Sequence, residues 1–461
     1  MPEPHPTHDV VVLGGGSGGY ACALRGAQLG LQVALVEQDK LGGTCLHRGC
    51  IPTKALLHAA EVADTAREGA RFGVRSHVEG IDMGQVLAYQ QGVVARLHKG
   101  LQGLVSSAKV DYVTGAGVLV GPLTVQVGDR VLTGRHLVLA TGSQARTLPG
   151  LSIEGRVMTS DQALTLTEVP QNVIVLGGGV IGVEFASVFR SFGSQVTVVE
   201  ALPRLVPGED EAISKTLERA FRKRSITVRT GARYAAVTQD EHSVTLTLED
   251  GATLGADLLL VAVGRGPVTA DLGYEAAGIT LNRGFVPTDE RLRTGVDGVY
   301  AVGDIVPGLQ LAHRGFAHGV FVAEDIAGLQ QQPVLDRGIP KVTYCDPEIA
   351  SVGLTETQAR AEYGDASVYE YNLGGNGKSQ ILGTAGFVKL VAAPQSAGGA
   401  VVGVHMIGAR MGEQIGEAQL IVGWDARADD VAPFIHAHPT QNEALGEAHL
   451  ALAGKPLHAH A

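Results

Sequence analysis

Cysteine is scarce in this chain, which has only four cysteines in 461 residues. Small secreted domains that depend on disulfides carry many more, so that class of protein is excluded. The sequence also lacks any uninterrupted apolar run near the roughly 18 residues of a membrane-spanning helix. Its polar start, Met1 to Asp9, lacks the apolar segment of a signal peptide. We therefore expect a cytoplasmic protein with no membrane partner.

Positive charge is also in short supply, with 36 lysines and arginines against 47 aspartates and glutamates. The net charge of -11 argues against a nucleic-acid partner, which would require a basic surface. An acidic face could still attract a basic protein. No metal site is expected.

Glycine, in contrast, is abundant, at 63 of 461 residues. This share is about twice the usual one of roughly 7%, and neither a collagen-like period nor a glycine-serine linker explains it. We attribute the excess to tight turns that contact ligands. At about 150 residues per domain, the length predicts roughly three domains.

One unit of sequence occurs twice: an apolar run, a G-x-G-x-x-G motif, a helical stretch, a second apolar run and a glutamate. The first copy runs from Asp9 to Glu37 and the second from Asn172 to Glu200. The interval from the first motif glycine to the glutamate is 23 residues in both copies. Each copy therefore predicts the strand, turn, helix and strand of a dinucleotide-binding fold.

The two copies predict two dinucleotide sites. Their glycines allow the pyrophosphate to approach a helix N-terminus, and the glutamate binds the ribose hydroxyls. Glu200 in the second copy favours NAD, because a carboxylate repels the 2′-phosphate of NADP. Arg204 lies four residues later and is of the type that binds such a phosphate, so NADP stays the less favoured alternative.

The segment Gly42–Lys54 places Cys45 and Cys50 five residues apart, just after the first copy. In a regular helix their Cα atoms would lie roughly 8 to 9 Å apart, beyond the limit of about 7 Å for a disulfide. A bridge therefore requires a distorted turn, which Gly49 permits. A strained bridge that closes a small loop stabilises little and is easily reduced, so the pair predicts a redox site. The alternative is two unlinked, reduced core cysteines.

Further strands end beside expected ligands. Leu137–Ser143 and Leu258–Arg265 have the same form in the two halves, and Gly298–Asp304 ends in an acid before a predicted helix. From about Val342 the pattern changes to alternating strands, which predicts a separate antiparallel sheet with helices.

His438 and Glu443 form a candidate acid-base pair near the C-terminus. The carboxylate follows the histidine by five residues, close enough on a turn to orient the ring. Thiol–disulfide exchange at a cysteine pair would use such a base, because the thiolate is the form that attacks a disulfide. Cys22 and Cys345 are predicted to be buried packing residues.

Taken together, these motifs resemble the flavoprotein disulfide reductases with two dinucleotide-binding domains, and among them the dihydrolipoyl dehydrogenase branch. The resemblance runs from about Asp9 to Leu450. Its most specific parts are GGTCLHRGCIPTKALL at 42 to 57, GGGVIGVEFAS at 177 to 187, AVGD at 301 to 304, LAH at 311 to 313 and HAHPTQNE at 436 to 443.

The resemblance implies two cofactors, FAD and NAD. Glu37 would contact the FAD ribose and Asp304 the ribityl chain. The full FAD set would be Gly14, Gly16, Gly19, Glu37, Gly43, Thr44, Lys54, Gly117, Thr141, Gly142, Ser143, Asp304, Leu311, Ala312 and His313. The NAD set would be Gly177, Gly179, Gly182, Glu184, Glu200 and Gly264.

It also implies a mechanism. Cys50 would lie against the flavin, Cys45 would exchange with substrate, and Lys54 would pair with Glu184. His438, and not His436, would be the base, oriented by Glu443 and supplied by the other subunit of a homodimer. The reaction would oxidise protein-bound dihydrolipoamide and reduce NAD. The implied partners are lipoyl domains and the E2 acyltransferase of a 2-oxo acid dehydrogenase complex.

The implied fold is α/β, with two Rossmann-like domains and a C-terminal α+β domain. Its expected boundaries are 1-150 for FAD binding, 151-270 for NAD binding, 271-341 for a central part that completes the FAD site, and 342-461 for dimerisation. Three alternatives stay open. Glutathione and trypanothione reductases expect NADP, which Glu200 disfavours. Mercuric reductase usually ends in a vicinal cysteine pair, whereas the last cysteine here is Cys345. A non-catalytic redox sensor would show no turnover.

Overall fold

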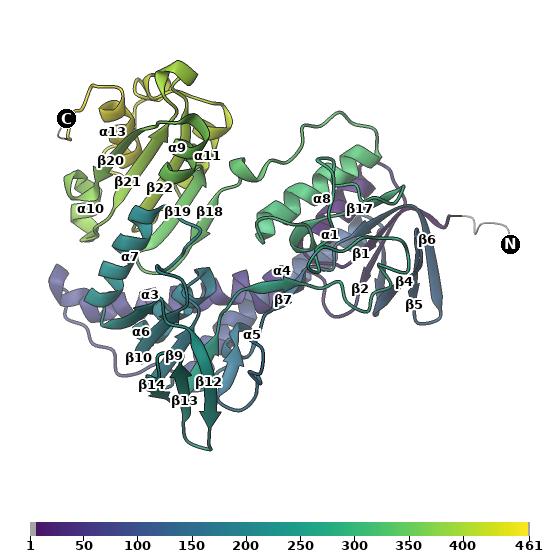
Figure 1. The fold of residues 1–461 in the computed structure, drawn as a ribbon, viewed down its shortest axis with the longest axis horizontal. Helices are drawn as coiled ribbons and strands as arrows, with labels where there is room; N and C mark the ends of the chain where they lie inside the picture. Colours follow the sequence, from purple (N-terminus) through teal and green to yellow (C-terminus); the bar gives the residue numbers. More distant parts are fainter. Residues whose placement is uncertain (1–5, 460–461) are drawn as a thin grey trace.

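Three larger sheets, of seven, five and five strands, organise the chain. They are seen in a computed structural model that describes residues 6–459. Figure 1 places the first repeated unit at the right, the second at lower centre and the C-terminal sheet at upper left. The expectation of an α/β chain with two Rossmann-like units and a C-terminal α+β unit is confirmed.

The first unit is built on a seven-stranded sheet in the order β3-β2-β1-β6-β5-β4, with β17 beside β6. β1, β2, β3 and the second half of β6 are parallel, and β17 extends this parallel part. The strands are β1 (His8–Leu13), β2 (Val33–Glu37), β3 (Asp111–Thr114), β4 (Gly117–Gly121), β5 (Thr124–Val127), β6 (Arg130–Leu139) and β17 (Val299–Ala301). The fully buried valines and leucines of β1 and β2 explain why this sequence forms the centre of the sheet.

Helices α1 (Ser17–Gln28) and α8 (Ala312–Ile326) pack closely on one face of this sheet. A Cβ atom on Gly319 would lie 2.2 Å from the carbonyl oxygen of Gly18. Glycine is therefore required where the two helices cross. The contact brings a segment far along the chain against the first glycine motif, as Figure 1 shows.

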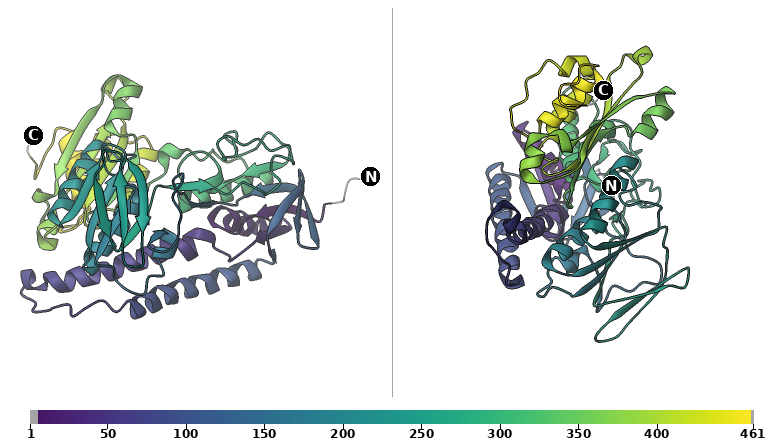
Figure 2. Two further views of the ribbon diagram at one scale, coloured as in Figure 1. Left: turned by 60° about the horizontal axis from the view of Figure 1, so that its bottom comes forward. Right: turned by 90° about the vertical axis from the view of Figure 1, so that its left-hand side faces the viewer.

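The redox segment leads into a long helical hairpin. α2 (Gly43–Arg48) ends just before α3 (Cys50–Glu68), and α4 (Met83–Ser107) returns beside α3. In the left view of Figure 2, α3 and α4 run side by side along the lower edge. The sequence did not predict the length of this hairpin.

The second unit repeats the parallel pattern in a five-stranded sheet of order β11-β10-β9-β15-β8. Its strands are β8 (Val157–Thr159), β9 (Asn172–Leu176), β10 (Gln195–Glu200), β11 (Ile226–Thr230) and β15 (Leu258–Val261), and its helices are α5 (Ser160–Ala163), α6 (Val180–Phe192) and α7 (Glu211–Lys223). A three-stranded meander is added, with β12 (Tyr234–Gln239), β13 (Val244–Leu248) and β14 (Thr253–Ala256). Two short antiparallel strands, β7 (Ser143–Ala145) and β16 (Arg265–Pro267), pair between the units.

The C-terminal sheet is antiparallel throughout, in the order β18-β19-β22-β21-β20. This confirms the change of pattern expected from about Val342. Its elements are β18 (Lys341–Thr343), β19 (Glu348–Gly353), α9 (Glu356–Tyr363), β20 (Ser367–Asn372), α10 (Gly377–Leu382), β21 (Phe387–Ala392), β22 (Val401–Gly408), α11 (Ile415–Gly423), α12 (Ala428–Val431) and α13 (Glu443–Leu452). Short 3-10 helices lie at Gly69–Phe72, Gly303–Ile305, Asp336–Gly338, Leu373–Gly375 and Gln395–Ala397.

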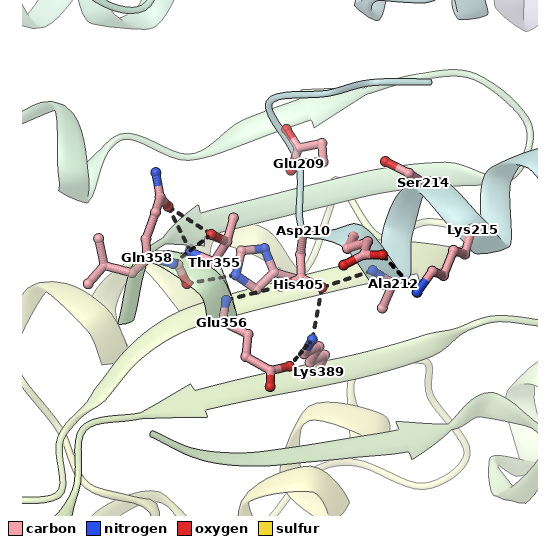
Figure 3. A network of polar contacts seen from close by, with 12 residues as sticks. Glu209, Asp210, Ala212, Ser214, Lys215, Thr355, Glu356, Gln358, Lys389 and His405 are labelled. Carbon is pink, nitrogen blue, oxygen red and sulfur yellow. Dashed lines mark hydrogen bonds and ion pairs between the residues drawn. The ribbon is translucent and has the colours of Figure 1, made fainter. Parts of the chain in front are cut away.

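A buried ionic network joins the second unit to this sheet (Figure 3). Lys389 on β21 contacts Asp210 at 2.8 Å and Glu356 at 2.7 Å. Asp210 also caps α7 by accepting the backbone N–H of Ala212. Asp210 and Lys389 are only 2% and 6% exposed. Loss of Lys389 would leave the buried Asp210 carboxylate without a cation, which is strongly destabilising. Loss of Asp210 would leave Lys389 paired with Glu356 alone. The network therefore fixes the start of α7 against the sheet.

Among residues 6–459, no helix is long and apolar enough to cross a membrane.

Candidate active site

A cavity of about 520 Å³ opens where the carboxyl ends of β1, β2 and β6 meet the starts of α1 and α3. Open α/β sheets bind ligands in this crevice. Most of the residues predicted for FAD and for redox chemistry line it: Gly14, Gly16, Glu37, Gly43, Thr44, Cys45, Cys50, Lys54, Gly117, Thr141, Gly142, Ser143, Glu184, Asp304, Leu311 and Ala312. Segments from the whole first two thirds of the chain therefore converge on one site.

Other predicted residues lie outside this lining: Gly19, Gly177, Gly179, Gly182, Glu200, Gly264, His313, His438 and Glu443. Gly19 lies beneath the first glycine turn, where a Cβ added to it would meet the Gly14 carbonyl oxygen. The His313 ring is exposed and its Nε2 contacts the Pro340 carbonyl oxygen at 2.7 Å. The first two residues of the predicted Leu-Ala-His segment therefore face the cavity, whereas the histidine ring is engaged elsewhere.

In both glycine motifs, the first and third glycines lie where a side chain has no room. Gly14 has φ +108°, and its Cβ would lie 2.3 Å from the Ala140 carbonyl oxygen; Gly177 has φ +114°, with the same distance to Ala262. At the third glycine, a Cβ on Gly19 or Gly182 would meet the first glycine's carbonyl oxygen at 1.7 Å or 1.9 Å. These cradles fit a pyrophosphate at the N-termini of α1 and α6, as the motif requires.

The glutamate of each copy lies beside its own glycine turn. Glu37 accepts the backbone N–H of Gly15 at 2.7 Å, and Glu200 accepts that of Gly178 at 2.6 Å. Both carboxylates are nearly buried, at 9% and 8% exposed. The two acids are thus held at equivalent places, next to the turn that would carry the dinucleotide.

Arg204, the residue that kept NADP open, is engaged within its own loop. Its guanidinium donates to the carbonyl oxygens of Pro207 and Glu209, both at 2.7 Å, and to Ser214 Oγ at 2.9 Å. An arginine with these partners is not free to bind a 2′-phosphate. This geometry favours NAD over NADP.

Cys45 and Cys50 lie on two different helices. Gly49 separates α2 from α3 with φ -143° and ψ -113°, so the backbone breaks where the sequence predicted a distorted turn. Both thiols are free. A hydrogen bond from the Cys45 thiol lowers the pKa of Cys50 to about 7, with a further contribution from Lys54. The same hydrogen bond, together with burial, raises the pKa of Cys45. Of the two thiols, Cys50 therefore has the lower pKa.

Lys54 and Glu184 form the predicted ion pair. Lys54 Nζ lies 3.0 Å from Glu184 Oε1 and 2.9 Å from Oε2. Burial lowers the pKa of Lys54, but the Glu184 carboxylate outweighs it, so that the pKa of Lys54 is raised and the ammonium stays charged. The pair crosses from α3 to α6 and joins the first unit to the second at the redox cysteines.

Thr141, Ser143 and Asp304 form a further part of the cavity wall. Ser143 Oγ donates to Asp304 Oδ2 at 2.5 Å, and Arg265 Nε donates to Ser143 Oγ at 2.8 Å. Thr141 Oγ1 donates to the Val268 carbonyl oxygen at 2.6 Å. Arg265 also lines the cavity, but sequence reasoning did not name it as a site residue, although it is the last residue of the segment expected to end beside a ligand.

His438 and Glu443 meet as predicted but away from the cavity. His438 Nδ1 and Glu443 Oε1 are 2.8 Å apart, and Glu443 Oε2 accepts the backbone N–H of Thr440. The His438 side chain is 76% exposed. His436 instead contacts Glu417 at 2.9 Å and is mostly buried. Of the two histidines, His438 is therefore the one whose ring is exposed.

The other two cysteines are buried, at 2% exposure each. Burial raises the pKa of Cys22 to about 12 and the pKa of Cys345 well above its usual value. They are the packing residues that the sequence predicted. In the described part of the chain, no group of three or more His, Cys, Asp or Glu side chains could hold a metal ion.

Comparison with known families follows the same division of the chain. Residues 8–319 match the pyridine nucleotide-disulphide oxidoreductase model, and residues 339–449 match the dimerisation domain of the same enzymes. The chain belongs to the pyridine nucleotide-disulphide oxidoreductase family. Its C-terminal sheet and helices are the dimerisation domain.

Several relatives are similar over nearly the whole chain. Dihydrolipoyl dehydrogenase of Bacillus subtilis is 41% identical, with 98% of this chain and 99% of the relative covered. That of Chlorobaculum parvum is 40% identical, with 95% and 96% covered. Leghemoglobin reductase of Vigna unguiculata is 38% identical, with 98% and 89% covered.

Solved structures show the same fold. LpdA of Mycobacterium tuberculosis has a TM-score of 0.90 at 27% identity, with 96% of this chain and 99% of that chain covered. The HOCl-induced flavoprotein disulfide reductase RclA of Escherichia coli has a TM-score of 0.86 at 28% identity, with 96% and 99% covered. The cofactors of this family member are FAD and NAD, and the two glycine cradles and the cavity fit them.

Proposed function

We propose that this chain is a dihydrolipoyl dehydrogenase, which oxidises dihydrolipoamide to lipoamide and reduces NAD. The observation that carries this proposal is the pair Cys45 and Cys50 on the cavity wall, beside Lys54 and its Glu184 partner. The relatives of that name, at about 40% identity over nearly the full length, support the same substrate.

The first copy and the cavity would hold FAD. The supporting features are the glycine turn at Gly14, the acid Glu37 for the ribose and Asp304 for the ribityl chain, all on the cavity wall. Thr44 and Thr141 to Ser143 would complete the site. FAD, when bound, supplies the two-electron chemistry between the thiols and NAD.

The second copy would hold NAD, with Glu200 on the ribose and the Gly177 turn at the pyrophosphate. Glu184 lies on α6 near this turn and also lines the cavity. It would therefore lie between the two dinucleotides. Because Arg204 is already occupied, the site favours NAD.

The protein's own residues would carry the exchange with substrate. His438 of a second copy takes a proton from one substrate thiol, and the thiolate attacks Cys45 Sγ. The Cys45–Cys50 bond breaks and its electron pair stays on Cys50. The second substrate sulfur then attacks the first, which closes the lipoyl disulfide and releases Cys45 as a thiol. The overall balance is dihydrolipoamide and NAD⁺ giving lipoamide, NADH and a proton.

The low pKa of Cys50 suits its place in this sequence. A thiolate with a low pKa is the better leaving group in disulfide exchange. Cys50 has a pKa of about 7, whereas the pKa of Cys45 is raised. The sulfur that leaves is thus Cys50, and the sulfur that exchanges with substrate is Cys45.

A homodimer would complete the site. His438 does not line its own cavity, and large apolar side chains are exposed near it: Phe434 at 73% and Ile435 at 98%. On the neighbouring α11, Leu420 is 50% exposed, and Trp424, directly after this helix, is 74% exposed. A second copy that covers this surface would bring His438 to the other chain's Cys45.

Mixed dimers would test this arrangement. A Cys45→Ser chain and a His438→Gln chain are each expected to be inactive as homodimers. Their mixed dimer should recover activity, because one of its two sites combines an intact Cys45 with an intact His438. No recovery would mean that the base acts within its own chain.

We further propose that the natural substrate is a lipoyl domain, and that the E2 acyltransferase of a 2-oxo acid dehydrogenase complex is the partner. The chemistry that supports this is the dithiol exchange itself, together with the names of the relatives. We divide the chain by function into FAD-binding, NAD-binding, central and dimerisation parts at the boundaries expected from the sequence.

Steady-state formation of NADH by the purified protein with dihydrolipoamide tests the proposed function. We expect rapid turnover with NAD, at least about tenfold less with NADP because of Glu200, and none with Cys50→Ser. Turnover that prefers NADP, or that appears only with glutathione disulfide, would assign the chain to one of the alternative reductases. A protein that binds FAD but turns over none of these substrates would contradict the proposal.

A further inference from the structure

The turn between β18 and β19 reaches out of the dimerisation domain to the redox centre. The backbone N–H of Tyr344 donates to Glu184 Oε1 at 2.9 Å, and that of Asp346 donates to Ser187 Oγ at 3.2 Å. Glu184 and Ser187 are three residues apart on α6 and share one face. Cys345, between the two donors, is buried in the same apolar cluster as α6. The turn is therefore fixed to α6 at successive points.

Tyr344 also contacts Lys54 through its ring. Lys54 Nζ lies 4.8 Å from the centroid of the Tyr344 ring, within the range of a cation–π interaction. Glu184 contacts the same ammonium through both carboxylate oxygens. One residue of the dimerisation domain thus touches both members of the ion pair, the acid with its backbone and the lysine with its ring.

The position of Lys54 matters because its charge acts on Cys50. A positive charge near a thiol stabilises the thiolate, and Lys54 is among the groups that favour the charged form of Cys50. A lysine side chain is long and has many rotamers, so a single carboxylate does not define where its ammonium lies. A second contact, to an aromatic ring, restricts it.

We propose that Tyr344 is a positioning residue of the redox centre, which holds the Lys54 ammonium beside Cys50 from a different domain. Its backbone orients Glu184 and its ring restrains Lys54. This inference rests on the proposed function for the role of Cys50. It also links the dimerisation domain directly to the thiolate, because the turn that carries Tyr344 belongs to the C-terminal sheet.

The test is a pH titration of the Cys50 thiolate in FAD-loaded protein. A thiolate beside an oxidised flavin gives a long-wavelength charge-transfer absorbance. In a Cys45→Ser background Cys50 is the redox thiol that remains, and serine retains a hydrogen-bond donor toward it. Tyr344→Leu should move the midpoint to higher pH, with about threefold less thiolate at low pH, as expected for loss of a partly exposed cation–π contact. Tyr344→Phe keeps the ring and the backbone N–H and should match the parent.

Two further variants separate positioning from stability. Tyr363→Leu makes the same substitution on α9 of the same domain, and should leave the midpoint unchanged. Tyr344→Leu in a Lys54→Met background should have no additional effect. A midpoint that does not move in Tyr344→Leu, or that moves equally without Lys54, would overturn the proposal.

The titration requires neither dihydrolipoamide nor NAD. A chain that fails the turnover assay but shows the expected shift would retain the role of Tyr344 and lose the proposed substrate. The reverse result would keep the substrate and remove Tyr344 from the redox centre.

Discussion

The two glycine-motif units of this chain have nearly the same local geometry and differ in what surrounds them. A Cβ added to Gly14 or to Gly177 would lie 2.3 Å from a carbonyl oxygen. Glu37 and Glu200 each accept a backbone N–H of their own glycine turn. Only the first unit's glycine turn, however, lines the 520 Å³ cavity with the redox cysteines, whereas the second unit contributes residues of α6 such as Glu184. The motif specifies a dinucleotide, whereas its surroundings decide how that dinucleotide is held.

The first unit is enclosed by segments from other parts of the chain. α2 and α3 bring the two cysteines, β17 leads to Asp304, and α8 begins at the cavity with Leu311 and Ala312. In the second unit, the Gly177 turn and Glu200 lie outside this cavity. A site walled by several segments suits a retained cofactor such as FAD, whereas a site outside the cavity suits NAD, which must leave after each turnover.

The largest expected effect comes from the redox cysteine pair, which only the first unit has. Cys50→Ser should retain FAD but reduce NADH formation from dihydrolipoamide by at least about 10³-fold, as for loss of a covalent catalyst. Cys22→Ser is the control, because that thiol is also buried and its pKa is raised to about 12. Unchanged turnover in Cys50→Ser would remove the disulfide mechanism.

The same substitution at the third glycine of each motif should impair the binding of a different cofactor in each unit. Gly19→Ala and Gly182→Ala each place a Cβ within 2 Å of a carbonyl oxygen, at 1.7 Å and 1.9 Å. Gly19→Ala should yield protein without yellow FAD. Gly182→Ala should keep FAD and raise the KM for NAD by about tenfold or more, since the pyrophosphate loses its cradle. Absorbance spectra and steady-state kinetics measure the two effects, and loss of FAD in both variants would contradict distinct roles.

The two acids should also differ in what they select. Glu200→Arg is expected to shift the preference from NAD toward NADP by about tenfold or more, because it replaces repulsion of the 2′-phosphate by attraction. Glu37→Gln should weaken FAD retention and leave the NAD to NADP ratio unchanged. The kcat/KM values for both nucleotides measure the shift. An unaltered ratio in Glu200→Arg would place Glu200 away from the ribose.

The smallest expected effect concerns pH. The pKa of Cys50 is lowered to about 7, so the thiolate and its charge-transfer absorbance should be present above that pH and lost as the pH falls through it. Lys54→Met should raise the midpoint by up to about one pH unit, because a nearby positive charge no longer favours the thiolate. If the midpoint of the unsubstituted protein lies near the pKa of an ordinary cysteine, Cys45 and Lys54 do not lower the pKa of Cys50.

Local signals in the sequence predicted the parts of the site that lie close together along the chain. Both glycine turns, both acids and the break at Gly49 follow from short motifs whose conformational demands are specific. The pairing of Lys54 with Glu184 came from the family resemblance, since the two residues are 130 positions apart. Arg265 and Tyr344 were missed because their roles depend on contacts between elements that no local pattern specifies. The individual cofactor and catalytic assignments stay predictions, as do the domain boundaries.

The most direct test of the proposed disulfide mechanism is the electron balance with dihydrolipoamide. Under anaerobic conditions, dihydrolipoamide alone should convert the Cys45–Cys50 disulfide to two thiols in each chain. Addition of NAD should then yield one NADH for each dihydrolipoamide oxidised and restore the disulfide. Thiols that form but yield no NADH with NAD, or NADH that forms while both cysteines are replaced by serine, would contradict it.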